Sequence, residues 1–561
     1  MKTIPIILRP FRLICFFIFA YLPVEAQFTA GGEPASFAAG IQYEACDSRR
    51  LSPPDAQVLS KEDAVDEALG LPVRVASLIP AGFSIENSGS WRWLGQGGRI
   101  WRLRIACRDA NALGLYFSEF YLPEDSRLFV YNSDCSRVLG AFTYLNNQES
   151  GLFAIEPLPG EELTIEYFEP ERLVDRPVIS ISEVAYVYRG YDGRGFGDSG
   201  PCEVNINCSP EGDEWQEVKK GVVRIQCRVG GAAFWCSGSL INNARLDKTP
   251  YLLTADHCAF KFQQYATQDD LNQWIFYFNF EGPGCDNPSQ SPTPVSLVGA
   301  TKVASGGDHG NDGSDFFFLR LNQLIPASYD AYFNGWTITE EPPSNLGVTI
   351  HHPEGDIKKI SFYNTSLTTA SWQGNGLNSH WKVYWAGTGN GFGVTEPGSS
   401  GCPLFDSQGR IIGTLTGGQA SCTNNTLPDY YGKFSYHWAS NGEDDTLKLK
   451  PWLDPDNTGI ESLGGIPLSL TEPVEDGSGQ VYIYPNPAKD RIFVSLGNPD
   501  PTEISVVLTD ARGALLINET DIISMDSQEI ELDLGELSDG LYLLRIVSDN
   551  NVSLHKLVLK K

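Results

Sequence analysis

A Gly-rich loop between residues 395 and 404 limits what this chain can fold into more than any other segment. The loop reads Thr-Glu-Pro-Gly-Ser-Ser-Gly-Cys-Pro-Leu. Glycines on both sides of Ser400 allow a tight turn that presents its hydroxyl group, with the N–H groups of Gly398 and Ser400 facing the same point. Gly/Ser-rich turns are also common on protein surfaces, so the meaning of this loop depends on residues elsewhere in the chain.

Two segments upstream supply the partners that a reactive serine needs. His257 directly follows an apolar run in Leu-Leu-Thr-Ala-Asp-His-Cys, and Asp315 directly precedes one in Gly-Ser-Asp-Phe-Phe-Phe-Leu. A serine hydroxyl needs an imidazole as base, and the imidazole needs a carboxylate that fixes its tautomer. The order His257, Asp315, Ser400 is one of the known chain orders of this constellation. We therefore expect Ser400 to be a nucleophile, His257 its general base and Asp315 the group that orients the base, with the N–H groups of Gly398 and Ser400 as oxyanion donors.

At these residues the sequence resembles a known family. Thr-Ala-Asp-His-Cys is similar to the histidine motif of chymotrypsin-like proteases, and the loop around Ser400 is similar to the serine motif of bacterial lysyl endopeptidases, a branch of that clan. The resemblance covers roughly residues 195–465. It includes Asp-Tyr-Tyr-Gly-Lys-Phe at 429–434 and Lys-Pro-Trp-Leu-Asp-Pro at 450–455. It implies two antiparallel β-barrels with the active site between them, and hydrolysis of peptide bonds through an acyl-enzyme.

Twelve cysteines in a chain with an export signal indicate disulfide bonds. The resemblance implies three pairs, of which the first ties the strand before the histidine to the residue after it: Cys236–Cys258, Cys202–Cys422 and Cys208–Cys285.

Further cysteines lie outside these three pairs. Cys107 and Cys135 could pair within the N-terminal region, which leaves Cys46 as the odd one. Cys227 and Cys402 could form a bridge that braces the nucleophile loop, which we favour, or remain two buried thiols.

Substrate selection depends on a buried carboxylate, because a desolvated ammonium without a counter-charge is costly. In trypsin this carboxylate lies six residues before the nucleophile. That position here holds Val394, whose apolar side chain cannot bind a cation. Lysyl endopeptidases place the carboxylate in a later Asp-x-Tyr-Gly motif, which Asp429 matches. We expect Asp429 to bind lysine, with arginine weaker, and Thr416 and Gly417 to line the same pocket. Thr416 stands where the family has a stacked imidazole. The alternative role for Asp429 is that of a turn residue after Pro428.

Both ends of the chain read as targeting segments. Residues 1–26 combine basic residues, an apolar stretch and a small-residue cleavage site, which is typical of a secretory signal peptide that is too short to span a bilayer. Residues 481–561 resemble the type A C-terminal sorting domain of the type IX secretion system, through Pro-Asn-Pro, a Gly-x-Tyr strand and two terminal lysines. A linker rich in Pro, Gly, Ser and acids covers 466–480. We expect a secreted or surface-located protein, released or attached, that meets the type IX machinery.

The region from 27 to 194 reads as a propeptide. Short alternating strands with polar turns suggest a sandwich. We expect it to assist folding and block the active site until removal, with a cut after Arg194 that leaves Gly195 as the first residue of the 195–465 protease domain. An independent binding module is the alternative. Ser399 stands where trypsin has an aspartate for the new terminal amine, so we expect no trypsin-type switch.

The expected fold class is mainly β, a chymotrypsin-like double β-barrel flanked by an N-terminal β-sandwich-like prodomain and a C-terminal Ig-like β-sandwich. A formal charge of −29 argues against a nucleic-acid partner. We expect protein or peptide substrates, a monomer, and no cofactor or metal. Five histidines show no zinc-type spacing and read as loop or packing residues: His309, His351, His352, His380 and His437. The competing functions are a protease of arginine or broad specificity, and an inactive surface adhesin on a protease scaffold.

Overall fold

A computed structural model describes most of the chain as two units, residues 1–468 and 469–561. The described residues are 29–560 except 69–71, 95–96, 174, 191–195, 308–311, 340–344, 374, 469–480, 485–487, 497–501, 511–514, 524–528, 536, 539 and 549–550. The predicted signal peptide, most of the predicted linker, the Pro-Asn-Pro segment, Arg194 and Gly195 lie outside them. No helix in these ranges is long and apolar enough to cross a membrane.

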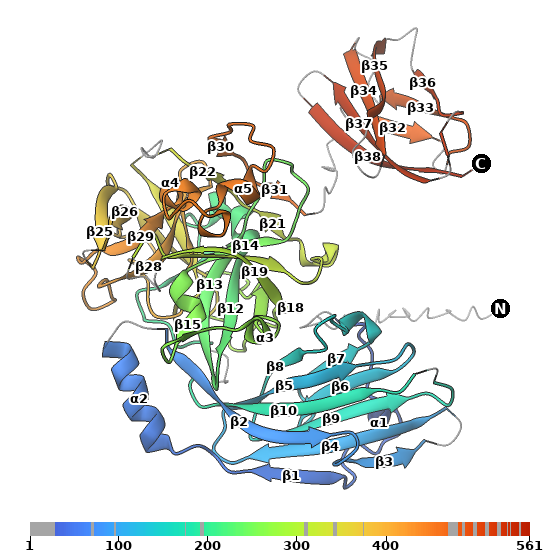
Figure 1. Cartoon of the computed structure of the whole chain (residues 1–561), viewed down its shortest axis with the longest axis vertical. Coiled ribbons are helices and arrows are strands. Elements are labelled where there is room, and N and C mark those ends of the chain that lie inside the picture. Colours follow the sequence, from blue (N-terminus) through green and yellow to red (C-terminus); the bar gives the residue numbers. More distant parts are fainter. Residues whose placement is uncertain are drawn as a thin grey trace, which may run out of the picture. The chain divides into compact units, whose positions relative to one another are not determined.

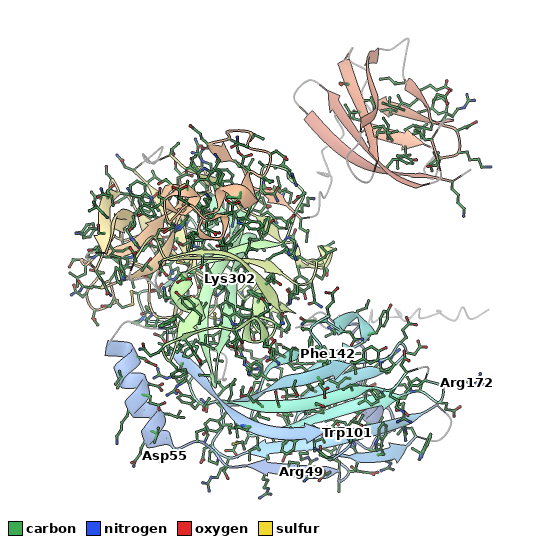
Figure 2. The ribbon with its side chains drawn as sticks, viewed as in Figure 1. Arg49, Asp55, Trp101, Phe142, Arg172 and Lys302 are labelled. Carbon is green, nitrogen blue, oxygen red and sulfur yellow. A yellow bond between two sulfur atoms is a disulfide. The ribbon has the colours of Figure 1, made fainter. Side chains whose placement is uncertain are left out.

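The N-terminal region is a sandwich of two sheets (Figure 1). One sheet orders its strands β1-β4-β9-β6-β7, with β3 beside β4, and the other contains β2-β10-β5-β8. The strands are β1 (Asp47–Leu51), β2 (Arg74–Ser84), β3 (Ser90–Trp93), β4 (Arg99–Cys107), β5 (Ala112–Tyr121), β6 (Arg127–Asn132), β7 (Val138–Phe142), β8 (Phe153–Pro159), β9 (Glu162–Glu169) and β10 (Val178–Val187). The helices are α1 (Ala35–Ala38) and α2 (Ala56–Ala68). Trp101 and Phe142, labelled in Figure 2, are fully buried in the core of this sandwich.

A first barrel-like sheet follows, built on β12 (Val222–Val229) and β13 (Ala232–Leu240). Its other elements are β14 (Tyr251–Thr254), the 3-10 turn η4 (Asp256–Ala259), β15 (Phe260–Lys261), β16 (Gln264–Tyr265), α3 (Gln268–Leu271), β17 (Ile275–Phe278), β18 (Val295–Val298), β19 (Ala300–Gly306) and β20 (Phe316–Leu321). Trp274, Phe276 and Leu319 are among its fully buried side chains. Their aromatic and aliphatic surfaces account for the closed core, because burial of apolar area is the main stabilising contribution.

The second barrel-like sheet orders its strands β11-β24-β23-β27-β28-β29-β26-β25, with β22 between β28 and β30. The strands are β11 (Val204–Asn205), β22 (Gly335–Thr337), β23 (Gly347–His351), β24 (Lys359–Tyr363), β25 (Thr368–Trp372), β26 (Asn375–Val383), β27 (Pro403–Asp406), β28 (Arg410–Gly418), β29 (Asp429–Lys433) and β30 (Ser462–Leu463). A short pair, β21 (Tyr332–Phe333) and β31 (Ile466–Pro467), lies apart from it, and the helices are α4 (Phe434–Ala439) and α5 (Lys450–Leu453). The mainly β double-barrel class predicted from the sequence is confirmed.

The N-terminal sandwich and the first barrel share one sheet. Strand β2 pairs antiparallel with β13, with Ser77 opposite Ala232 and Ala76 opposite Ala233. The sheet therefore runs β18-β17-β12-β13-β2-β10-β5-β8 without a break. Trp235 and Tyr277 of the barrel also belong to the apolar core of the sandwich. The two regions thus form one packed body.

The second unit is a small β-sandwich. One sheet has the order β32-β33-β36 and the other β35-β34-β37-β38. Its strands are β32 (Val481–Tyr484), β33 (Arg491–Leu496), β34 (Thr502–Asp510), β35 (Leu515–Ile523), β36 (Glu529–Asp533), β37 (Gly540–Ser548) and β38 (Asn551–Leu559). Ile492, Leu532 and Leu544 lie in its core. The alternation of buried and exposed residues along these strands is what a two-sheet packing requires.

Three disulfides join the cysteine pairs that the family resemblance implied: Cys202–Cys422, Cys208–Cys285 and Cys236–Cys258. The other suggested bridges are absent among the described residues. Cys107 and Cys135 are free thiols, as is Cys46.

The favoured Cys227–Cys402 bridge is wrong, because both thiols are free and lie in different apolar cores. Burial raises the pKa of both thiols, that of Cys402 to about 12. They are therefore packing residues, which is the alternative that the sequence left open.

Candidate active site

The histidine turn and the aspartate turn meet because their strands are neighbours. His257 lies in η4, directly after β14, and Asp315 lies directly before β20. Strands β14 and β20 pair antiparallel, with Thr254 opposite Phe317. The end of one strand therefore lies beside the start of the other, which brings two residues 58 positions apart into contact. Asp315 has a φ of 56°, a left-handed conformation that turns its side chain at the start of the strand.

His257 and Asp315 form a tightly held pair. Asp315 Oδ2 lies 2.8 Å from His257 Nδ1, and its Oδ1 accepts from the His257 backbone N–H at 3.0 Å. A carboxylate beside Nδ1 keeps the proton on that nitrogen, which leaves the lone pair on Nε2. His257 Nε2 is buried and has no hydrogen-bond partner among the described residues. Burial alone would lower the pKa of His257, but the Asp315 carboxylate outweighs burial and raises the pKa above its ordinary value of 6.5.

The nucleophile loop is seated against the histidine turn. The Ser400 carbonyl accepts from the Ser237 N–H on β13 at 2.8 Å. A Cβ on Gly401 would lie 2.1 Å from Thr254 Oγ1 and 2.6 Å from the Ala255 nitrogen, so only glycine fits here. Thr254 and Ala255 immediately precede η4. The loop carrying Ser400 therefore abuts the turn carrying His257, and Ser400 itself is half-buried rather than enclosed.

The backbone N–H groups of the two expected oxyanion donors, unlike those of the residues that follow each of them, have no acceptor among the described residues. Ser399 N–H donates to the Glu396 carbonyl at 3.0 Å, and Gly401 N–H donates to the Leu415 carbonyl at 2.9 Å. In the part of the chain that the structure describes, no acceptor receives the N–H groups of Gly398 and Ser400. Two N–H groups two positions apart, with no described acceptor, can both donate to a developing oxyanion.

Asp429 lies at the start of β29 and is 1% exposed. Its Oδ2 accepts from Trp385 Nε1 at 2.6 Å and from Thr395 Oγ1 at 2.7 Å, and its Oδ1 accepts from the Ala420 N–H at 3.1 Å. Burial raises the pKa of Asp429, although these donors partly offset it. Thr395 opens the nucleophile loop, so the carboxylate is tied to the segment that carries Ser400.

Thr416 and Gly417 lie on β28, next to β29. Thr416 Oγ1 is 3.0 Å from Nε2 of His380, a residue of β26. An imidazole therefore does lie beside the position where the family has its stacked ring, but it comes from another strand. Gly417 faces the ring of Trp372, which a Cβ would approach to 3.1 Å.

Four of the five histidines read as loop or packing residues are buried and have specific polar partners; His309 lies outside the described residues. His351 Nδ1 lies 2.8 Å from Oγ of Ser399, the residue before the nucleophile. His437 Nδ1 lies 2.7 Å from Oγ of Ser314, the residue before Asp315. These imidazoles thus support the neighbours of the predicted nucleophile and aspartate, a role that spacing along the sequence does not reveal.

The N-terminal sandwich reaches the rim of this site. Lys261, four residues after His257, places its Nζ 2.7 Å from Asp66 Oδ2 on α2 and 3.3 Å from the Pro72 carbonyl. The same Nζ lies 4.8 Å from the Phe234 ring on β13. A half-enclosed ion pair and a shared sheet therefore connect this sandwich to the elements that carry His257 and Ser237.

Comparison with known families gives two matches. Residues 196–432 match the family model described as lysyl endopeptidase, C-terminal domain, and residues 482–560 match the secretion system C-terminal sorting domain. The lysyl endopeptidase of Pseudomonas aeruginosa is 28% identical over 293 residues, which cover 50% of this chain and 60% of that protein. The chain therefore spans less than two thirds of the length of this curated relative.

Several solved structures are similar in part. A Glu endopeptidase in complex with MPD has a TM-score of 0.27 at 15% identity, covering 43% of this chain and 94% of its own. The thermostable serine protease AL20 from an extremophilic microorganism has a TM-score of 0.28 at 15% identity, covering 40% and 99%. Protease Anisep from Arthrobacter nicotinovorans has a TM-score of 0.27 at 18% identity, covering 38% and 90%.

Proposed function

We propose that this chain, which carries a lysyl endopeptidase domain match and a secretion sorting domain, is an exported serine endopeptidase. The observation that carries the proposal is the His257–Asp315 pair, with a 2.8 Å contact at Nδ1. The segment directly before the His257 turn abuts the turn that holds Ser400. A buried imidazole whose other nitrogen has no described partner is arranged to accept a proton from a nearby hydroxyl group.

The reaction would proceed in two halves. His257 Nε2 takes the proton of the Ser400 hydroxyl as its oxygen attacks the substrate carbonyl, and the N–H groups of Gly398 and Ser400 receive the oxyanion. The protonated imidazole, stabilised by Asp315, then gives its proton to the leaving amine. Water repeats the sequence and releases the acyl group from Ser400.

For selectivity, we propose that Asp429 favours substrates with lysine before the cleaved bond. A carboxylate that is 1% exposed and carries a raised pKa gains from a cation, because the ammonium offsets the cost of burying the charge. Its hydrogen bond to Thr395 ties that charge to the loop of the nucleophile. Arginine is expected to be the weaker substrate.

The N-terminal sandwich is proposed to be a prodomain that supports folding and restricts access to the site. Two contacts support this role: the pairing of β2 with β13, and the Lys261–Asp66 ion pair four residues from His257. Domain limits at 27–194 and 195–465 remain part of the proposal. The C-terminal unit is proposed to direct the chain to the type IX machinery, so the protease acts outside the cell or on its surface.

A panel of amide substrates with lysine, arginine or an apolar residue before the cleaved bond tests these proposals. Matured protein should hydrolyse the lysine substrate fastest. Ser400→Ala should lower kcat by at least about 10⁴-fold with an unchanged circular dichroism spectrum. Equal rates on lysine and arginine would favour the broader protease. Absence of hydrolysis on every substrate would favour the inactive adhesin.

A further inference from the structure

The segment that follows the predicted prodomain is bound by a buried carboxylate. Gly197 N–H donates to Asp356 Oδ1 at 2.8 Å, and Ser199 Oγ donates to Asp356 Oδ2 at 2.5 Å. Gly200 N–H donates to Glu396 Oε2 at 2.9 Å. Asp356 is 1% exposed, whereas Gly197 lies at the surface. Burying a carboxylate this deeply is costly, and the Gly197 N–H is one of the donors that offset the cost.

Asp356 ends a turn that packs on the nucleophile loop. Within this turn, Glu354 N–H donates to the Pro397 carbonyl at 2.5 Å. A Cβ on Gly398 would lie 2.9 Å from the Gly355 nitrogen and 3.0 Å from the His352 carbonyl. The turn therefore lies directly against Pro397 and Gly398, and Gly398 is one of the two expected oxyanion donors.

The position that pairs with a new terminal amine in trypsin cannot do so here. Ser399 occupies it, and its hydroxyl is 2.8 Å from His351 Nδ1. Because residue 399 is a serine and not an aspartate, a terminal amine released near residue 197 needs a different carboxylate as its partner. Asp356 is the buried carboxylate that already contacts the nitrogen of Gly197.

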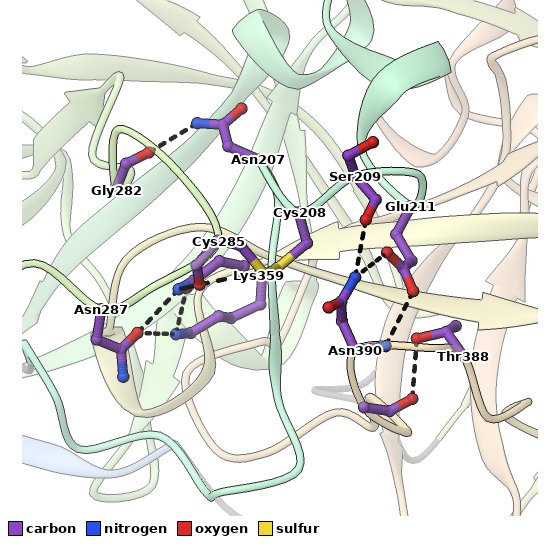
Figure 3. The surroundings of a disulfide bond; sticks show 12 residues. Asn207, Cys208, Ser209, Glu211, Gly282, Cys285, Asn287, Lys359, Thr388 and Asn390 are labelled. Carbon is purple, nitrogen blue, oxygen red and sulfur yellow. Dashed lines mark hydrogen bonds between the residues drawn. A yellow bond between two sulfur atoms is a disulfide. The ribbon is translucent and has the colours of Figure 1, made fainter.

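The charged groups around Asp356 include one lysine, Lys359, and a second carboxylate, Glu396. Lys359 Nζ lies 3.4 Å from Asp356 Oδ2. The same Nζ donates to the amide oxygens of Asn205 at 2.7 Å and Asn287 at 3.4 Å. Figure 3 shows the contact between Lys359 and Asn287. Glu396 lies close enough to Asp356 for the two negative charges to repel each other. An ammonium at Gly197 would offset part of this excess of negative charge.

We propose that Asp356 is the receptor for the α-ammonium of a mature chain that begins at Gly197. Hydrolysis of the bond before Gly197 adds one water, leaves a carboxylate on Phe196 and converts the amide N–H into an ammonium. A charge-assisted hydrogen bond to Asp356 then replaces the neutral one. The inference rests on the proposed maturation by prodomain removal, and it places the first residue two positions beyond the cut expected after Arg194.

The reactivity of the new amine tests the proposal without relying on catalysis. In full-length protein carrying Ser400→Ala, residues 192–196 are replaced by the recognition sequence of a site-specific protease that cleaves directly before Gly197. The cut protein and a peptide of residues 197–203 are treated with an acetylating reagent at pH 7. An ion pair that raises the pKa of the amine by about one unit makes acetylation about tenfold slower than in the peptide.

The control variants separate Asp356 from general shielding. Asp356→Asn should return the acetylation rate to within about twofold of the peptide rate, whereas Glu214→Gln, an exposed carboxylate elsewhere, should leave it slow. A peptide-like rate in the cut protein with Asp356 intact would overturn the proposal, even if the Asn variant fails to fold. Equally slow acetylation in a folded Asp356→Asn variant would also overturn it. Because Ser400→Ala hydrolyses nothing, these outcomes are independent of the substrate panel.

Discussion

At the scale of single residues, the site depends on charges held out of water. Asp315 and Asp429 are both almost fully buried, yet each has designated donors: the His257 ring and N–H for the first, and Trp385, Thr395 and Ala420 for the second. Such carboxylates keep their geometry because every alternative leaves a buried charge unpaired. Their effects should therefore be visible as pH dependence and as selectivity.

The first expectation concerns pH. The general base must be neutral to accept the serine proton, and Asp315 raises the pKa of His257 above 6.5. Activity should therefore decline as the pH falls, with the midpoint of the acid limb of kcat/KM above 6.5 for matured protein. Asp315→Asn should lower kcat about 10⁴-fold, since the tautomer is no longer fixed. A midpoint at or below 6.5 in the unmodified enzyme would contradict this reading of the pair.

The second expectation concerns Asp429. Asp429→Asn keeps the shape and removes the charge, so kcat/KM for lysine substrates should fall about 10²- to 10³-fold, corresponding to about 3–4 kcal/mol for a lost buried ion pair. Apolar substrates should change by less than about threefold. Asp269→Asn, an exposed carboxylate, serves as the matched control. A parallel loss on all substrates would show that Asp429 is a structural turn residue, the alternative left open by Pro428.

The residues of the predicted constellation could be found from the sequence because His257 and Asp315 each stand beside an apolar run and Ser400 stands in a Gly-rich turn. The supporting imidazoles could not. His380 reaches Thr416 from a strand 36 positions away, and His437 reaches Ser314 over 123 positions. Such contacts follow from strand order, which local motifs do not encode. The predicted Cys227–Cys402 bridge, which would brace the nucleophile loop from the first barrel, failed for the same reason, because the two cysteines belong to separate cores.

At the scale of elements, the pairing of β2 with β13 joins the N-terminal sandwich, our proposed prodomain, to the first barrel. Every residue of β13 is buried, and the first three residues of β2 are buried as well. Such patterns occur in any buried strand, so they do not indicate which two strands pair. Hydrogen bonds along an edge strand are independent of side-chain identity, and specificity must come from flanking contacts. Gln226 donates to the Tyr116 hydroxyl at 3.1 Å, and Arg228 lies 2.7 Å from Glu183.

Lys261 provides a test of this interface. Burial lowers the pKa of Lys261, while its partner Asp66 opposes that effect, so the two side chains depend on each other. After the connection between prodomain and protease is cut, Lys261→Met should weaken prodomain binding about tenfold, as measured by the dissociation rate on a sensor surface. Lys302→Met, an exposed lysine of β19 labelled in Figure 2, should leave the rate unchanged. Equal dissociation rates for both variants would show that the Lys261–Asp66 ion pair contributes no measurable binding energy to the interface.

At the scale of the whole molecule, the protein buries several neutral imidazoles. Burial lowers the pKa of His351 to about 3 and that of His380 to about 4, and lowers those of His352 and His437 as well. The unfolded chain protonates these rings near their ordinary value of 6.5, whereas the folded protein does not. Each ring therefore destabilises the fold as the pH falls below 6.5.

His351→Gln isolates one of these contributions. Between pH 6.5 and 4.5, full-length Ser400→Ala protein should lose about 1.4 kcal/mol of unfolding free energy per pH unit relative to the same protein with His351→Gln. Urea unfolding at three pH values gives this difference directly. The comparison cancels the titration of groups that do not contact His351. Glu203 is not among them, because its Oε2 lies 3.7 Å from His351 Nε2 and its raised pKa acts in the opposite direction. A difference that does not change with pH would mean that His351 is accessible to protons in the folded state.

If the N-terminal sandwich blocks the site as proposed, the shared sheet would make the onset of activity after cleavage depend on protein concentration. While the chain is intact, the tether holds the two partners at an effective concentration of the order of millimolar, so they remain together whatever the surroundings. Once the tether is severed, the fraction of molecules that remain paired depends on their concentration relative to the dissociation constant. A crowded compartment would keep the severed pair associated, and release into open medium would separate it. Dilution would then separate the severed N-terminal sandwich from the rest of the protein and open the site.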